Sequence, residues 1–189
     1  MFPGWIEPDR AQYAKQTAGQ TNVVSLARRG RGQPRMKWVT RERPVIDRIA
    51  CPWLIAKFID KEPEFLFVPP ADVIPVAERT GGTPYDVPGV ELSHVGEGCS
   101  FDAFVSKYGL DHDPAISTIA TIVRGADTGR PDLTPQSAGL LAISMGLRDL
   151  TPDDQEVLKR GFVIYDALYA WASKRMAETH NWPPEMPKA

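Results

Sequence analysis

The order of apolar and polar residues along the chain predicts a small sheet followed by a layer of helices. Two short runs rich in aromatic and β-branched residues, 38–40 and 64–68, are typical of strands. Pro44 follows the first run and disfavours a helical backbone at Arg43, and two prolines end the second run. After the turn in PYDVPG, residues 90–95 are expected to form a further strand. The sheet should therefore lie in the first half of the domain.

The other hydrophobic segments are predicted to be helices. In VIDRIACPWLIAKFID the proline belongs in a first helical turn, so we expect regular helix to begin near Cys51. Ser100 is a suitable N-cap for the next helix. Each of three further helices should begin where a capping side chain precedes a proline, because the cap accepts a free N–H and proline has none to satisfy. These pairs are Asp113-Pro114, Thr134-Pro135 and Thr151-Pro152.

The segment PQSAGLLAISMGL is apolar on nearly all sides, which predicts a central, buried helix. The last helix has one apolar face, which predicts packing on one side only. The combined expectation is the α+β class: a mainly helical single domain with a small N-terminal β-sheet. A chain of 189 residues with 42% hydrophobic content is long enough for one such core.

Charge divides the chain into three parts. Residues 1–43 hold nine Lys/Arg against three Asp/Glu, whereas the remainder holds thirteen against twenty-one. We expect a flexible basic arm over residues 1–35, the folded domain over 36–176 and an irregular tail over 177–189. In one interpretation the arm binds nucleic-acid phosphates and gains affinity from the counterions it releases. In the other, which we favour, the arm is a solvated linker. Nucleic-acid binding is therefore not expected without a further domain.

Composition bears on location and redox state. The N-terminus has no basic segment followed by an apolar run, and no stretch approaches 18 apolar residues. We therefore expect a cytoplasmic protein that does not span a membrane. The two cysteines, Cys51 and Cys99, are far apart in sequence, and in that compartment reduced thiols are expected in place of a disulfide.

Groups that bind ligands are concentrated in VELSHVGEGCSFDAF. The turn at Gly96–Gly98 would bring Glu97, Cys99 and Asp102 back toward His94. Nitrogen and carboxylate ligands suit Zn, Mn or Fe, and a thiolate would favour Zn. Two alternatives stay open. The N–H groups of the turn would form an anion seat, or Ser100 simply caps a helix while the cysteine and histidine are structural.

A second polar group lies in IVRGADTGRPD. Asp127 stands near a helix C-terminus, where the dipole disfavours an acid, so Arg124, Arg130 or a metal ion is expected to compensate it. Earlier in the chain, Arg48 precedes Cys51 at a helix start, which would lower the pKa of that thiol. A packed, inert thiol is the other interpretation, and we favour it.

Five segments together resemble the C-terminal domain of the ChrB family of chromate-resistance proteins: DRIACPWLI, VPGVELSHVGEGCSFD, IVRGADT, PQSAGLLAIS and YDALYAW. The resemblance extends over about 37–171. It implies a role in the response to chromate, in a family whose members occur alone or joined to a sulfurtransferase domain. The 35 residues before it do not resemble the large N-terminal domain of the full regulator, so DNA-binding control by this chain alone is not expected.

With the resemblance, we expect a divalent cation (Zn, Mn or Fe) beside a small oxyanion, and sensor thiols that react with an oxidant. In some members of the family that this chain resembles, a histidine stands where this chain has Arg124, which implies a metal site in those members. Arg124 removes that ligand here, which weakens the expectation of a metal and favours an oxyanion contact by Arg124. The alternative is a non-catalytic sensor or regulatory interaction module, and both enzymatic activity and a homo-oligomer stay undecided. The expected metal ligands are His94, Glu97, Asp102 and Asp127; the expected oxyanion and redox groups are Arg48, Arg124, Cys51 and Cys99.

Overall fold

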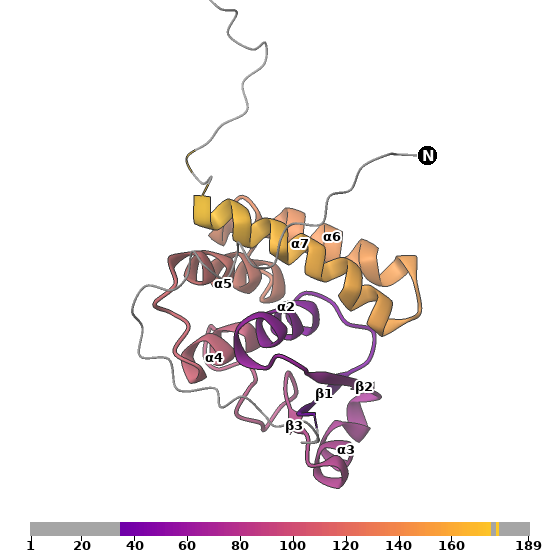
Figure 1. Ribbon diagram of the computed structural model, residues 1–189. Helices are drawn as coiled ribbons and strands as arrows, with labels where there is room; N and C mark the ends of the chain where they lie inside the picture. The colour runs from indigo at the N-terminus through magenta and orange to yellow at the C-terminus, as the bar shows by residue number, and fades with distance from the viewer. Residues whose placement is uncertain (1–34, 175–176, 178–189) are drawn as a thin grey trace, which may run out of the picture. The chain divides into compact units, whose positions relative to one another are not determined.

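The computed structural model describes residues 35–174 and residue 177 (Figure 1). The predictions of a flexible arm over 1–35 and an irregular tail over 177–189 therefore lie almost entirely outside the described residues. The described part is an α+β domain, mainly helical with a small sheet near its N-terminal end, as the sequence predicts. No helix in this part is long and apolar enough to cross a membrane.

Three parallel strands form the sheet, in the order β2-β1-β3. The central strand β1 (Lys37–Arg41) pairs along its whole length with β2 (Glu64–Val68) and over two residues with β3 (Thr83–Pro84). Parallel neighbours need a crossover connection. Helix α2 (Asp47–Leu54), continued by a π-helical turn over Ile55–Ile59, joins β1 to β2, and α3 (Val73–Thr80) joins β2 to β3. The two strands predicted over 38–40 and 64–68 are confirmed.

Four helices complete the domain: α4 (Ser100–Lys107), α5 (Pro114–Asp127), α6 (Ser137–Leu150) and α7 (Asp154–Lys174). In Figure 1 the sheet and α3 lie at one end of this domain, α6 and α7 lie at the other, and α2 lies between them. The Asp113 carboxylate accepts the N–H groups of residues 115 and 116 at the start of α5, so that predicted cap is confirmed. The other two proline-linked helices begin two residues later than expected, at Ser137 and Asp154.

Large aromatic side chains fill the core around α2. Trp38, Trp53, Phe101, Phe104 and Tyr165 are almost completely buried. Helix α2 also lies close against α7, because a Cβ built on Gly161 would come within 2.3 Å of an Ile49 methyl group. The start of α2 is therefore held firmly within the core.

Three predictions about these elements are wrong. Helix α2 begins at Asp47 and contains Pro52, because the carbonyl of Ile46 accepts N–H groups in the first turn and burial of the helix outweighs the one bond that proline cannot make. Residues 90–94 form no strand, since the N–H of Asp86 donates to the Leu92 carbonyl and closes a loop. Helix α6 is not central: it buries only one face, and Ile143 is 48% exposed.

Candidate metal centre

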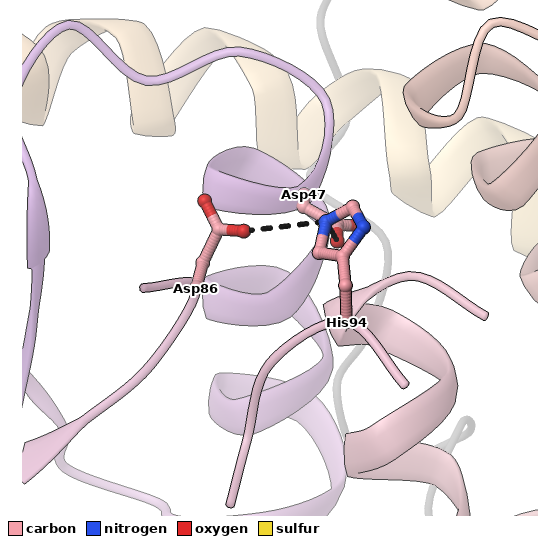
Figure 2. Close-up of side chains that lie close together, drawn as sticks. All are labelled: Asp47, Asp86 and His94. Carbon is pink, nitrogen blue, oxygen red and sulfur yellow. Dashed lines mark ion pairs between the residues drawn. The ribbon is translucent and has the colours of Figure 1, made fainter. Parts of the chain in front are cut away.

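His94 stands at the centre of a cluster of three carboxylates. Its Nε2 lies 3.1 Å from an Asp127 oxygen, 3.5 Å from an Asp86 oxygen and 3.6 Å from an Asp47 oxygen. Figure 2 shows the imidazole beside the Asp47 and Asp86 carboxylates. The aspartates are 1%, 3% and 16% exposed for Asp47, Asp86 and Asp127, whereas His94 is 43% exposed. The carboxylates thus form the floor of the cluster and the imidazole forms part of its open side.

Three separate segments bring these groups together. Asp47 is the first residue of α2 and Asp127 is the last residue of α5. Asp86 follows β3 with a left-handed backbone, at φ 54°, which turns the chain into the loop closed on Leu92. That loop ends at His94. Convergence therefore depends on the tertiary fold and not on proximity in sequence.

The N-terminus of α4 holds two of the carboxylates in place. The backbone N–H of Ser100 donates to Asp47 Oδ2 at 2.6 Å, and the Ser100 hydroxyl donates to Asp86 Oδ1 at 2.9 Å. The positive end of a helix dipole favours negative charge at this position. Ser100 was expected to cap α4, but Cys99 occupies the N-cap position, and Ser100 instead orients the acids of the cluster.

Asp86 also carries two cationic partners. Arg41 and Arg48 donate to its Oδ2 at 2.7 Å and 3.0 Å. Its other oxygen faces Ser100 and His94. The two arginines thus compensate the buried charge of Asp86 at Oδ2, and Oδ1 remains directed into the cluster.

Asp47 is the least compensated acid of the cluster. Burial, reinforced by the charges of Asp127 and Asp86, raises the pKa of Asp47 well above its ordinary value, against the lowering effects of the Cys99 thiol and the Ser100 backbone N–H. Its Oδ1 has no hydrogen-bond partner among the described residues. Burial and the charge of Asp86 also raise the pKa of Asp127, against the lowering effect of His94. Carboxylates so close together require a proton or a cation between them.

These atoms have the chemistry and spacing of a metal site. One ligand atom each from Asp47, Asp86 and His94 lie within 4.8 Å of one another, and Asp127 approaches the same imidazole nitrogen. Tetrahedral metal–ligand bonds of about 2.0–2.1 Å place neighbouring ligand atoms roughly 3.3 Å apart, and the separations from His94 Nε2 of 3.1–3.6 Å are similar. Asp47, Asp86 and His94 form the compact group, and Asp127 joins it through its contact with His94. The residues present fit a divalent ion with oxygen and nitrogen ligands.

The cluster opens into a pocket of about 480 Å³. Its lining consists of His94, the turn over 96–98, Asp127, Thr128 and Arg130. A ligand would therefore reach the imidazole side of the cluster from solvent.

The structure brings together some of the residues predicted from sequence and separates others. His94 and Asp127 meet, as expected. Asp102 instead accepts two bonds from Arg124, at 2.8 Å and 2.6 Å; although burial raises the pKa of Asp102, these bonds hold it below its ordinary value. Glu97 is 88% exposed and pairs with Arg130. The ligand roles of these two acids stay predictions that the geometry does not favour.

Asp47 and Asp86 are the acids that the sequence interpretation missed as ligands. Asp47 looks like an ordinary acidic residue in the first turn of a helix, and Asp86 looks like an ordinary turn residue before a proline. Only a partial signal marks Asp86. Its neighbours Tyr85 and Val87 are apolar and buried, whereas an acid in an ordinary surface turn has exposed neighbours.

Cys51 and Cys99 lie in the core beside the cluster. Both are free thiols, 0% and 1% exposed. Burial, followed by the charge of Asp47, raises the pKa of each thiol. The favoured interpretation of Cys51 as a packed thiol agrees with this environment, and the alternative of a lowered pKa is wrong.

Comparison with known proteins places the chain in a family. The profile of the ChrB C-terminal domain matches residues 38–172. Protein ChrB of Cupriavidus metallidurans is 30% identical over 133 residues, which cover 70% of this chain and 40% of that protein. The chain thus matches about two fifths of the length of this curated relative. No solved structure matches it. The family match covers most of the described domain, including all four residues of the cluster, and the chain belongs to the ChrB C-terminal domain family.

Proposed function

We propose that this chain binds a divalent transition-metal ion through His94, Asp47, Asp86 and Asp127, in a role related to chromate resistance. Membership of the ChrB family supports the general role. The cluster supports the specific activity, since imidazole nitrogen and carboxylate oxygen are ligands that suit Zn, Mn or Fe.

One observation carries the proposal: the buried Asp47 carboxylate has an oxygen without a partner within a group of acids around one imidazole. A buried polar atom without a partner is costly, and native structures supply a partner for most such atoms. A divalent ion would supply that partner for Asp47, Asp86 and Asp127 together. It would also use the neutral imidazole of His94, whose Nε2 already faces all three acids.

The arginines first expected to hold an oxyanion are engaged with acids. Arg48 donates to Asp86, and Arg124 forms a two-bond pair with Asp102. Such bidentate pairs are among the stronger polar contacts in proteins. The cluster itself therefore favours a cation, and these two arginines act by positioning acids.

The thiols do not support a redox step at this site. Reactivity requires the thiolate, but burial raises the pKa of both Cys51 and Cys99. The proposal therefore assigns metal binding to oxygen and nitrogen ligands and gives the cysteines a packing role.

Metal content tests the proposal. The 189-residue chain, purified without a metal-affinity tag, should retain close to one transition-metal ion, or bind one Zn²⁺ after treatment with chelator and dialysis. His94→Ala and Asp86→Asn should remove that ion. His112→Ala is the matched control, because His112 is exposed and bonds the Gly109 carbonyl away from the cluster. Wild-type protein that binds no metal above the level of His94→Ala would contradict the proposal.

The same geometry also favours a non-catalytic sensor module. The ligands come from α2, α5 and the loop over 86–94, so a bound ion would link the loop and the end of α5 to the start of α2, and its occupancy would favour one arrangement of these elements. Hydrogen exchange with and without Zn²⁺ tests this alternative. Slower exchange along the C-terminal half of α5 and the start of α4 would support a conformational signal, and protection limited to residues beside the ligands would count against it.

A further inference from the structure

The pocket in front of the cluster contains a cation of its own. Arg130 is one of its lining residues, together with His94, Asp127, Thr128 and Glu97. The sequence interpretation considered Arg130 only as a partner of Asp127. The structure does not pair these two side chains, so Arg130 has a different role to explain.

The end of α5 places Arg130 at this pocket. The helix ends at Asp127, Thr128 is its C-cap, and Gly129 adopts a left-handed backbone with φ 69°. This turn lets the N–H of Arg130 return to the Gly125 carbonyl at 3.0 Å. Asp127 and Arg130 therefore line the same pocket from the two sides of one tight turn.

Among the arginines near the cluster, Arg130 has the ion pair that a ligand would replace most easily. It donates to Glu97 at 3.2 Å, with 43% and 88% of the two side chains exposed. Exposed pairs of this kind contribute little net stability. Arg48 is instead held by the buried Asp86 and Arg124 by two bonds to Asp102. A ligand that enters the pocket would compete for Arg130 without breaking a buried contact.

A bound divalent ion would make the local charge positive. Arg41 and Arg48 both pair with Asp86, while Asp47 and Asp127 face His94. With every acid ionised and His94 neutral these groups sum to one net negative charge, and with one proton shared between the acids they sum to zero. A divalent ion that replaces this proton gives one net positive charge, and bound ions are often the largest charge in a site, so an anion would be attracted more strongly after metal binding than before it.

We propose that the metal-loaded protein binds a small oxyanion in this pocket, with one oxygen on the metal and another accepting from the Arg130 guanidinium. The inference rests on the proposed metal site and adds its second ligand. The open side of the cluster faces the pocket, so the anion oxygen would be a fifth ligand beside the four protein ligands, a coordination number that a Zn²⁺ site can reach. The Thr128 hydroxyl donates to the Arg124 carbonyl, which leaves Arg130 as the donor to the anion.

A titration of the Co²⁺-loaded full chain with sodium sulfate tests the inference, at ionic strength held constant with perchlorate. Sulfate should change the visible absorption bands of the bound Co²⁺ with a saturable dependence. Arg130→Gln should raise the sulfate dissociation constant about tenfold or more, because it removes a charge-assisted contact, and should leave Co²⁺ binding unchanged. Titration with acetate distinguishes a tetrahedral dianion from a carboxylate as the preferred oxyanion.

Two variants make the result specific. Arg160→Gln is the matched control, since Arg160 is 45% exposed and also forms a single pair with a glutamate; its sulfate titration should equal that of the wild type. Glu97→Gln should tighten sulfate binding, because it removes the competing acid. If Co²⁺ binds but neither anion changes its spectrum, or if Arg130→Gln behaves as Arg160→Gln does, this inference fails alone. If wild-type protein binds no Co²⁺, the proposed function fails with it.

Discussion

Asp47→Asn should make the metal-free protein more stable and should abolish its stabilisation by metal. The asparagine oxygen would still accept the N–H of Ser100, which now donates to Asp47 Oδ2 at 2.6 Å. Its amide group would donate toward the neighbouring acids, where Asp47 Oδ1 has no partner among the described residues. An unsatisfied buried polar group costs about 1–3 kcal/mol. The free energy of unfolding of the metal-free variant at neutral pH should rise by roughly that amount.

The effect with metal present has the opposite sign. Zinc at 100 times its dissociation constant stabilises a protein by about 2.7 kcal/mol, which for a domain of this size corresponds to a rise in Tm of roughly 5–11 °C. Mutation of a residue that only supports a metal ligand weakens metal affinity by up to about 100-fold. Loss of a direct ligand such as Asp47 should therefore weaken zinc affinity by at least about 100-fold. At the same zinc concentration the stabilisation then falls to about 0.4 kcal/mol.

Thermal and urea unfolding, each with and without Zn²⁺, measure both quantities. Asp113→Asn is a suitable control, since Asp113 caps α5 outside the cluster and asparagine caps equally well; its Tm shift with zinc should equal that of the wild type. The reasoning is refuted if Asp47→Asn lowers the stability of the metal-free protein by more than 1 kcal/mol, or if the variant keeps the full zinc shift.

Three further predictions concern packing, pH and the thiols. Gly161→Ala should lower the free energy of unfolding by about 1–3 kcal/mol, because its Cβ would meet Ile49 at 2.3 Å, whereas Gly139→Ala in open space on α6 should be neutral or stabilising; urea unfolding of both variants checks this. Burial and neighbouring acids raise the pKa of Asp47 above 3.8, so the folded state retains its proton longer than the unfolded state, and the stability of the metal-free protein should fall as pH rises above about 3.8. A rise in the free energy of unfolding of the metal-free protein over pH 4–7 would contradict this prediction. Cys51 and Cys99, buried with raised pKa values, should react with a thiol reagent only after unfolding, and rapid labelling of the native protein would show otherwise.

The sequence predicted elements whose signals are local. The strand at Trp38, the cap at Asp113 and the stop at Gly109, which has φ 60°, each depend on a few neighbouring residues. The helix over 137–150 was predicted to be buried because its composition is apolar on nearly all sides. Composition does not reveal which faces receive a partner, and α6 leaves Leu150 68% exposed.

The candidate site was predictable only in part for the same reason. His94 and Asp127 attracted attention because a histidine beside a glycine turn and an acid at a helix C-terminus are locally unusual. Asp47 and Asp86 are locally ordinary. Their importance depends on a left-handed turn, a closed loop and the N-terminus of α4, which meet only when the sheet and helices assemble.

X-ray absorption spectroscopy of the zinc-loaded protein tests the central claim most directly, because it reports the atoms bound to the metal. We expect a first shell of only nitrogen and oxygen at about 2.0–2.1 Å, with outer-shell scattering from one imidazole that His94→Ala removes. A sulfur shell at about 2.3 Å, which would require Cys51 or Cys99 as ligands, or a shell without imidazole would contradict it.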